Sequence, residues 1–258
     1  MQHQRFSRSI QFQSDVDLLN SLDLMARVNF LTNVDFVVFD AVGTLIEPDP
    51  AACDVYQRVG QHYGSSLSLE QIASRFGTAF AAEEAVDSVA ELQRWPTSEL
   101  RERQRWQRIV ESVFCDVDHA DQALFKELWD YFGQGKHWKL YDDVTDVWSR
   151  LTQEGYQLAI ASNFDKRLLN VCESKPPLCT CHHIFWSAEI GYPKPSSQFF
   201  TTVQSRIETP AQRILMVGDS ELNDERGANS AGWKSVLIKR HHPGSYTSSI
   251  SSLHCLWQ

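Results

Sequence analysis

Carboxylates follow two apolar stretches that lie far apart in the sequence. Asp40 comes directly after VDFVVF (34–39), and Asp219 comes one glycine after RILMV (213–217), with Asp224 five residues further on. A carboxylate held in place can attack an electrophile as a nucleophile, and several carboxylates together can bind a divalent cation. Acidic residues are also common where strands end and helices begin, so this chemistry requires that the three side chains meet in space.

A lysine and a Ser-Asn pair could supply contacts to an anion. Lys194 lies between two prolines, and Ser162 and Asn163 follow the apolar run YQLAIA (156–161). An ammonium group on a stiff loop suits pairing with a phosphoryl group and with the Asp40 carboxylate, while a hydroxyl and an amide can donate to phosphate oxygens. Taken singly, each of these residues would be an ordinary loop or turn residue.

Strand-like and helix-like segments alternate along much of the chain. The strand-like runs are 34–39, 156–161, 183–188, 213–217 and 233–238, and the helix-like segments between them are 143–154, 165–173, 195–206 and 221–231. This order predicts an α/β fold with a Rossmann-like three-layer core, in which a mostly parallel sheet has helices on both faces. Asp40, Ser162 and Asp219 would then meet beyond the carboxyl ends of their strands.

Residues 48–140 interrupt the alternation, because they contain successive helical patterns at 50–63, 69–85, 97–117 and 121–133 and no strand-like run. Thr97 is the candidate N-cap of the third helix. We therefore expect an all-helical cap at 48–140, inserted into a core formed by 34–47 and 141–258. Residues 1–33 form an N-terminal extension that we expect to be partly disordered, and the Ser-rich tail predicts a loop followed by an edge strand.

Composition narrows the class of partner. The 24 basic and 33 acidic residues give a net charge of −9, which argues against nucleic acid or an anionic membrane as the main partner. No apolar run approaches the roughly 20 residues of a membrane span, and the first residues lack a secretory signal, so we expect a cytoplasmic protein with reduced thiols. The sequence does not indicate an oligomeric state.

A second group of metal-ligand residue types, Cys172, Cys179, Cys181, His182 and His183, does not have the spacing of a standard zinc site. We interpret this segment as a loop that leads into a strand.

Four motifs occur in a characteristic order: FDAVGTL (39–45), ASN (161–163), YPKP (192–195) and VGDSELNDERGA (217–228). They resemble the four motifs of the haloacid dehalogenase superfamily of hydrolases. The helical insertion is similar to the cap of subfamily I of that superfamily, and WQRIV, SNFDKRL and GDSELNDERGA are similar to its rhythmically expressed gene 2-like group. The resemblance covers residues 34–258.

The resemblance implies a magnesium-dependent phosphatase that acts on a small phosphorylated metabolite through an aspartyl-phosphate intermediate. It implies the following roles: Asp40 as the nucleophile with Lys194 as its catalytic partner; Ser162, Asn163 and Lys194 as phosphate-binding residues; and Asp40, the backbone carbonyl of Val42, Asp219 and Asp224 as Mg²⁺ ligands or, for Asp224, an orienting residue.

One position departs from the pattern of the phosphatases in this superfamily, which usually carry a second aspartate where this chain has Val42. That aspartate is their general acid and base, and such assistance is typically worth about a hundred- to ten-thousandfold in rate. Three interpretations follow: a phosphatase for good leaving groups or with an acid borrowed from the cap or water, a 2-haloacid dehalogenase-like or other non-phosphate hydrolase, and a non-catalytic binding protein. The related dehalogenases work without metal and lack the acidic residue of the fourth motif.

Overall fold

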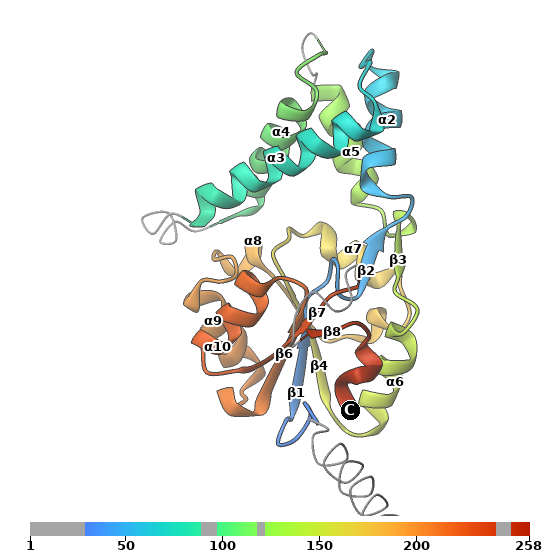
Figure 1. Ribbon diagram of the computed structural model, residues 1–258. Coiled ribbons are helices and arrows are strands. Elements are labelled where there is room, and N and C mark those ends of the chain that lie inside the picture. Colours follow the sequence, from blue (N-terminus) through green and yellow to red (C-terminus); the bar gives the residue numbers. More distant parts are fainter. Residues whose placement is uncertain (1–28, 89–96, 118–121, 241–248) are drawn as a thin grey trace, which may run out of the picture.

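A six-stranded sheet forms the centre of the protein in the computed structural model, which describes residues 29–88, 97–117, 122–240 and 249–258 (Figure 1). The strand order is β5-β4-β1-β6-β7-β8. The strands are β1 (Phe36–Phe39), β4 (Gln157–Ser162), β5 (His183–Trp186), β6 (Ile214–Gly218), β7 (Lys234–Ile238) and β8 (Ser249–Ile250). Each neighbouring pair is parallel, so the carboxyl ends of all six strands lie at one edge.

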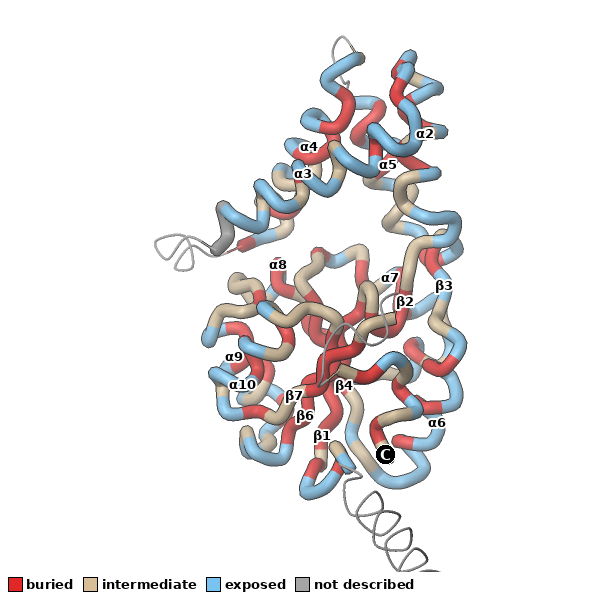
Figure 2. Tube along the Cα trace, in the orientation of Figure 1, coloured by how far each residue is buried: buried red, intermediate tan, exposed pale blue. Residues whose placement is uncertain are grey.

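Helices cover both faces of the sheet, as the apolar strands require. Along β1, Phe36 and Val38 contribute to one hydrophobic cluster and Val37 and Phe39 to the other, and all four are buried (Figure 2). The Val37 face packs against α6 (Val144–Gln153), α7 (Arg167–Glu173) and the C-terminal turn Leu253–Trp257, and the Phe36 face against α9 (Ser197–Ile207) and α10 (Gly227–Ser230). The predicted three-layer α/β core is confirmed.

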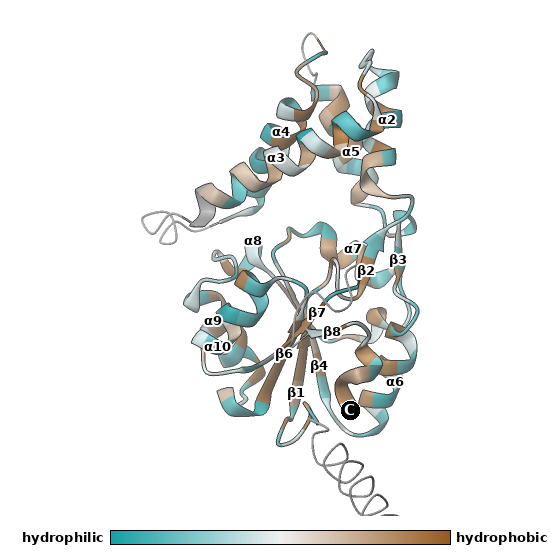
Figure 3. Ribbon diagram, in the orientation of Figure 1, coloured by the Kyte–Doolittle hydropathy of each residue, from teal (hydrophilic) through white to brown (hydrophobic). Residues whose placement is uncertain are grey.

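Four helices between residues 52 and 132 pack around an apolar cluster of their own (Figure 3). They are α2 (Ala52–His62), α3 (Leu69–Ser88), α4 (Glu99–Val113) and α5 (Gln122–Phe132), and we call them the cap. In their cluster the rings of Tyr56 and Phe114 stack with centroids 6.0 Å apart. None of the helices in the described ranges is long and apolar enough to cross a membrane.

The expectation that 48–140 contains no strand is wrong at both ends of the cap. Between the cap and the sheet, β2 (Ile46–Pro48) pairs antiparallel with β3 (Trp138–Leu140), and three residues are too few to show a strand period. The N-cap of α4 is Ser98 rather than Thr97, since the Ser98 hydroxyl accepts from the Arg101 N–H at 3.2 Å. The division into 34–47 and 141–258 for the core and 48–140 for the cap stays a prediction.

Two further segments differ from the expected elements. The strand predicted at 183–188 ends at Trp186, where α8 (Ser187–Ile190) begins. The helix predicted at 221–231 begins as a π-helix, Glu221–Arg226, because the N–H groups of both Asp224 and Glu225 donate to the Ser220 carbonyl. Such wide turns are frequent at functional sites.

Short 3₁₀ turns complete the described elements: Gly135–His137, Leu178–Thr180 and Ala211–Arg213. The predicted extension at 1–33 falls mostly outside the described residues, although Leu31 is buried against the Val37 face.

Candidate active site

Three carboxylates from distant parts of the chain meet at the carboxyl edge of the sheet. Asp40 follows β1, Asp219 follows β6, and Asp224 lies in the π-helix after β6. One oxygen from each lies within 4.8 Å of the others. At that separation two unit charges repel by roughly 3.5 kcal/mol at an effective dielectric near 20. The cluster therefore needs positive charge to remain ionised.

Lys194 supplies part of that charge from the loop before α9. Its ammonium nitrogen, which is almost fully buried, lies 2.7 Å from Asp40 Oδ1, 2.5 Å from Asp224 Oδ1 and 2.9 Å from the Ala161 carbonyl. An ammonium group has three protons, so all three have protein acceptors. To contact a substrate phosphoryl group, Lys194 would have to exchange one of these bonds.

The pKa values of these groups follow from burial and from their neighbours. Burial, together with the negative charges of Asp40 and Asp224, raises the pKa of Asp219 to about 7. Burial also raises the pKa of Asp224, although Lys194 opposes this. Burial alone would lower the pKa of Lys194, but the carboxylates of Asp224 and Asp40 more than offset it, so the lysine is held protonated.

Two glycines allow the acidic loops to approach this closely. Gly43 has a φ of +80°, and a Cβ there would lie 2.4 Å from Asp219 Oδ2. A Cβ on Gly218 would lie 2.2 Å from the Asp224 carboxyl group. A larger residue at either position would therefore force an acidic side chain to move.

The Ser162-Asn163 pair lies at the end of β4, as the sequence predicts. Asn163 is bonded to the backbone of Lys194 in both directions: Nδ2 donates to the Lys194 carbonyl at 2.9 Å, and Oδ1 accepts from the Lys194 N–H at 2.7 Å. Its side chain thus fixes the lysine loop and has one amide proton left for another acceptor. Ser162 is buried beside it, with 3% of its surface exposed.

Val42 occupies the loop between β1 and β2. It is half-buried, packs against the Val37-face cluster and forms a backbone bridge with Ile46. Its side chain is a hydrocarbon, so it can neither donate nor accept a proton.

Two basic residues after β7 bind the backbone of the loops that carry Asp40 and Asp219. The sequence did not lead us to expect them in the site. Lys239 donates to the Asp219 carbonyl, and Arg240 donates to the Thr44 carbonyl at 2.5 Å and to Asp143 Oδ2 at 2.7 Å. The signal was present, because Lys239 and Arg240 directly follow the strand predicted at 233–238 and so lie at the same edge of the sheet as Asp40.

The residues fit a hard divalent cation. Mg²⁺ binds through a few carboxylate oxygens and balances negative charge, and three carboxylates with one lysine leave the site acidic. Within the described parts of the chain, Asp40, Asp219 and Asp224 are the only cluster of at least three His, Cys, Asp or Glu residues with metal-binding spacing. Of the Cys-His segment, Cys172 is buried in α7, Cys179 is exposed on a 3₁₀ turn, and the segment leads into β5.

Comparison with known proteins identifies the family of this chain. The family model for haloacid dehalogenase-like hydrolases matches residues 34–232. Haloacid dehalogenase-like hydrolase domain-containing protein 3 of Danio rerio is 24% identical over 212 residues, which are 80% of this chain and 86% of the relative.

Solved structures of a phosphatase and of a dehalogenase both share the fold of this chain. YfnB of Bacillus subtilis, a HAD-hydrolase bound to magnesium, matches with a TM-score of 0.70 at 20% identity over 87% of this chain and 97% of that one. A HAD phosphatase from Thermococcus onnurineus has a TM-score of 0.59 at 20% identity, over 86% of this chain and 95% of that one. L-2-haloacid dehalogenase from Xanthobacter autotrophicus has a TM-score of 0.63 at 16% identity, over 81% of this chain and 79% of that one. At these identities the likeness shows the fold alone.

Magnesium affinity should depend on pH near neutrality. A metal ligand must be deprotonated, so below the pKa of about 7 at Asp219 the ion has to displace a proton. We expect affinity to fall about tenfold for each pH unit below 7 and to level off above it. Calorimetric titration in two buffers of different ionisation enthalpy would measure both affinity and proton release. Affinity that does not change between pH 6 and pH 8 would contradict the assignment of Asp219.

The Gly218→Ala variant should disturb Asp224 in particular. The new Cβ would displace the Asp224 carboxyl group from Lys194, so we expect a loss of roughly 1–3 kcal/mol in the free energy of unfolding and weaker magnesium binding. Urea unfolding and calorimetry would measure the two effects. Gly77→Ala in α3 is the control, because nothing lies within 4 Å of its Cβ position; it should keep the magnesium affinity and, since alanine favours a helix, raise stability by up to about 1 kcal/mol. Wild-type stability and affinity in Gly218→Ala would show that the close approach has no consequence.

Proposed function

Because this chain belongs to the haloacid dehalogenase-like hydrolase family, we propose that it is a magnesium-dependent hydrolase of a small phosphorylated metabolite. The observation that carries this proposal is the contact of Lys194 with both Asp40 and Asp224, beside Asp219. It combines a candidate nucleophile, a fixed positive charge and a set of metal ligands at one point.

Asp40 is the proposed nucleophile. Lys194 donates to its Oδ1 at 2.7 Å, so we assign the attack to the other oxygen, Oδ2. In the first step Oδ2 forms a bond to phosphorus while the bond from phosphorus to the leaving-group oxygen breaks. In the second step water attacks the resulting acyl phosphate, which releases phosphate and restores the Asp40 carboxylate.

The remaining residues bind and orient the phosphoryl group. Asp40, Asp219, Asp224 and the Val42 carbonyl would hold Mg²⁺, which when bound would offset the negative charge of the phosphoryl oxygens. Ser162 and the second amide proton of Asn163 are the proposed donors to the phosphoryl group, and Lys194 would join them by exchanging one of its bonds.

Val42 limits which substrates would react well. A leaving alkoxide needs a proton, and the side chain two residues after Asp40 cannot supply one. We therefore expect substrates with good leaving groups, such as aryl or acyl phosphates, to be cleaved fastest.

A halide leaving group would also need no proton, so a dehalogenase remains the alternative that the experiment must exclude. The acidic pair Asp219 and Asp224 favours phosphate, because a metal-free reaction has no use for two further carboxylates within 4.8 Å of the nucleophile. A non-catalytic binding protein would show no turnover with either class.

A substrate panel with and without magnesium tests the proposal. We expect wild-type protein to hydrolyse an aryl or acyl phosphate only with Mg²⁺, and Asp40→Asn to lower the rate by more than about a thousandfold. Phosphate release measures turnover, and circular dichroism checks the fold. Asp146→Asn, an exposed aspartate of α6, is the matched control and should be fully active.

Turnover that survives complete chelation would contradict the phosphatase proposal and favour the dehalogenase. Activity retained in Asp40→Asn would reject the nucleophile. No turnover of any compound by folded, magnesium-loaded protein would favour a binding role.

Val42→Asp should raise the rate on alkyl phosphates. By the resemblance to the phosphatases of this superfamily, the new carboxyl group would take the position of their general acid and base, an effect typically worth about a hundredfold or more where proton transfer limits turnover. Aryl phosphates should gain little, because their leaving groups need less protonation. The ratio of kcat/KM for an alkyl and an aryl phosphate, compared between variant and wild type, measures this effect. An unchanged ratio would mean that the lack of an acid at Val42 does not limit the reaction.

A further inference from the structure

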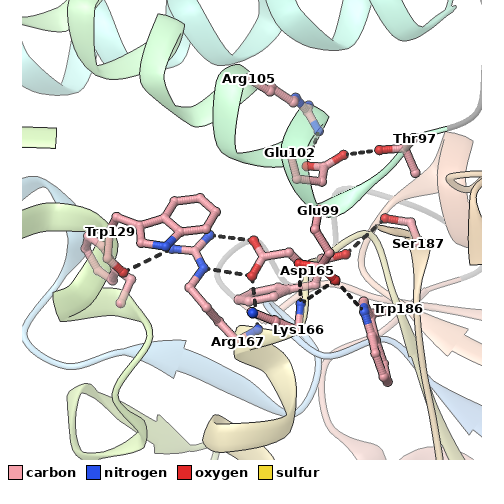
Figure 4. Close-up of polar contacts among 12 residues, drawn as sticks. Thr97, Glu99, Glu102, Arg105, Trp129, Asp165, Lys166, Arg167, Trp186 and Ser187 are labelled. Carbon is pink, nitrogen blue, oxygen red and sulfur yellow. Dashed lines mark hydrogen bonds and ion pairs between the residues drawn. The ribbon is translucent and has the colours of Figure 1, made fainter. Parts of the chain in front are cut away.

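The cap contacts the core through the first residues of α4 (Figure 4). Glu99 Oε1 accepts from Trp186 Nε1 at 2.9 Å, and both Glu99 oxygens accept from the Lys166 N–H, at 3.1 and 3.2 Å. Trp186 ends β5, and Lys166 lies in the loop after β4. One carboxylate of the cap therefore joins two segments of the core.

The neighbouring Thr97 contacts a third core segment. Its N–H donates to the Gly191 carbonyl at 2.7 Å, three residues before Lys194. Its hydroxyl donates to Glu102 Oε1 at 2.7 Å within the cap, which fixes Thr97 in a buried position. The segment 97–99 thus contacts both the loop that carries Asn163 and the loop that carries Lys194.

A second contact holds the loop after β4 from the other side. The Arg167 guanidinium forms a two-point ion pair with the buried Asp165, at 2.8 and 2.7 Å. It also lies 3.4 Å from the ring centroid of Trp129 in α5 and donates to the Trp129 carbonyl. The loop 163–167 is therefore held by α4 at Lys166 and by α5 at Arg167.

These two core loops are the ones that meet at the candidate active site. Asn163 bonds the Lys194 backbone in both directions, and Lys194 contacts Asp40. A displacement of the cap that breaks the Glu99 contacts would release Lys166, three residues from Asn163. Because hydrogen bonds to a charged group are stronger than neutral ones, loss of the Glu99 contacts should matter more than loss of the neutral bond from Thr97 to Gly191.

We propose that Glu99 is a positioning residue that couples the position of the cap to the geometry of the Asn163–Lys194 pair. When the cap is in the observed position, Glu99 holds the loop after β4, whose Asn163 binds the Lys194 backbone, so that Lys194 faces Asp40. When the cap moves away, the loops loosen and the nucleophile loses its fixed partner. The consequence for turnover rests on the proposed phosphatase function, whereas the coupling itself does not.

Amide hydrogen exchange, resolved to single residues, tests the coupling without any substrate. In Glu99→Ala we expect the Lys166 N–H to exchange roughly tenfold faster, and the Lys194 N–H, which Glu99 does not contact, also faster by a smaller factor. Glu99→Gln should fall between Glu99→Ala and wild type, because an amide oxygen keeps one acceptor. Trp186→Phe, which removes one donor to Glu99, should change exchange in the same direction.

Matched controls come from the same chain. Glu111→Ala removes an exposed glutamate of α4 that accepts a hydrogen bond from Gln107 within the same helix, at 2.9 Å. Trp257→Phe removes an indole N–H that donates to Glu154 far from the cap. Neither control should change exchange at Lys166 or Lys194. In protein that hydrolyses an aryl phosphate, Glu99→Ala should lower kcat about tenfold and leave KM within about twofold.

Unchanged exchange at both amides in Glu99→Ala would overturn the proposal. Faster exchange at Lys166 with wild-type exchange at Lys194 would overturn the coupling, because Glu99 would then hold only its own neighbours. A kcat equal to that of Glu111→Ala would overturn the positioning role. If wild-type protein hydrolyses no phosphate, the proposed function fails, but the two exchange rates still decide the coupling.

Discussion

The buried ammonium group of Lys194 is the interaction on which the rest of the site depends. A buried charge is stable only when it is paired and fully hydrogen-bonded, and Asp40, Asp224 and the Ala161 carbonyl meet that requirement. These partners come from the ends of β1, β4 and β6, so the parallel sheet is what brings them together. Removing any one strand end would leave a charge without its partner.

The lysine balances only part of the negative charge around it. Asp40, Asp219 and Asp224 together carry three negative charges when ionised, and the high pKa of Asp219 shows that the protein alone does not stabilise all of them. Folding keeps the three carboxylates close together despite their repulsion, because the hydrophobic clusters on both faces of the sheet fix the strand ends in place. A cation that relieves the repulsion would stabilise the folded state and prepare the nucleophile at the same time.

The sequence was sufficient for the core and for the acidic cluster because both follow from local signals. Apolar runs of five or six residues show the strands, and the position after each run places Asp40 and Asp219. The pairing of β2 with β3, the π-helix at Asp224 and the contacts of Glu99 were not predictable in the same way. They depend on where distant segments meet, and residue types alone do not carry that information.

The contacts between distant segments also decide how the cap is attached to the core. The cap has an apolar cluster of its own around Tyr56 and Phe114, and Phe132 at the end of α5 joins it to the Val37-face cluster through Tyr56 and Trp138. On the side of the cap that faces the Asn163 and Lys194 loops, Glu99 and Thr97 contact the core through polar groups, which water can replace at modest cost. An apolar interface of the same extent would resist separation more strongly. Polar contacts at the Asn163 and Lys194 loops therefore suit the proposed coupling, in which the cap moves relative to these loops.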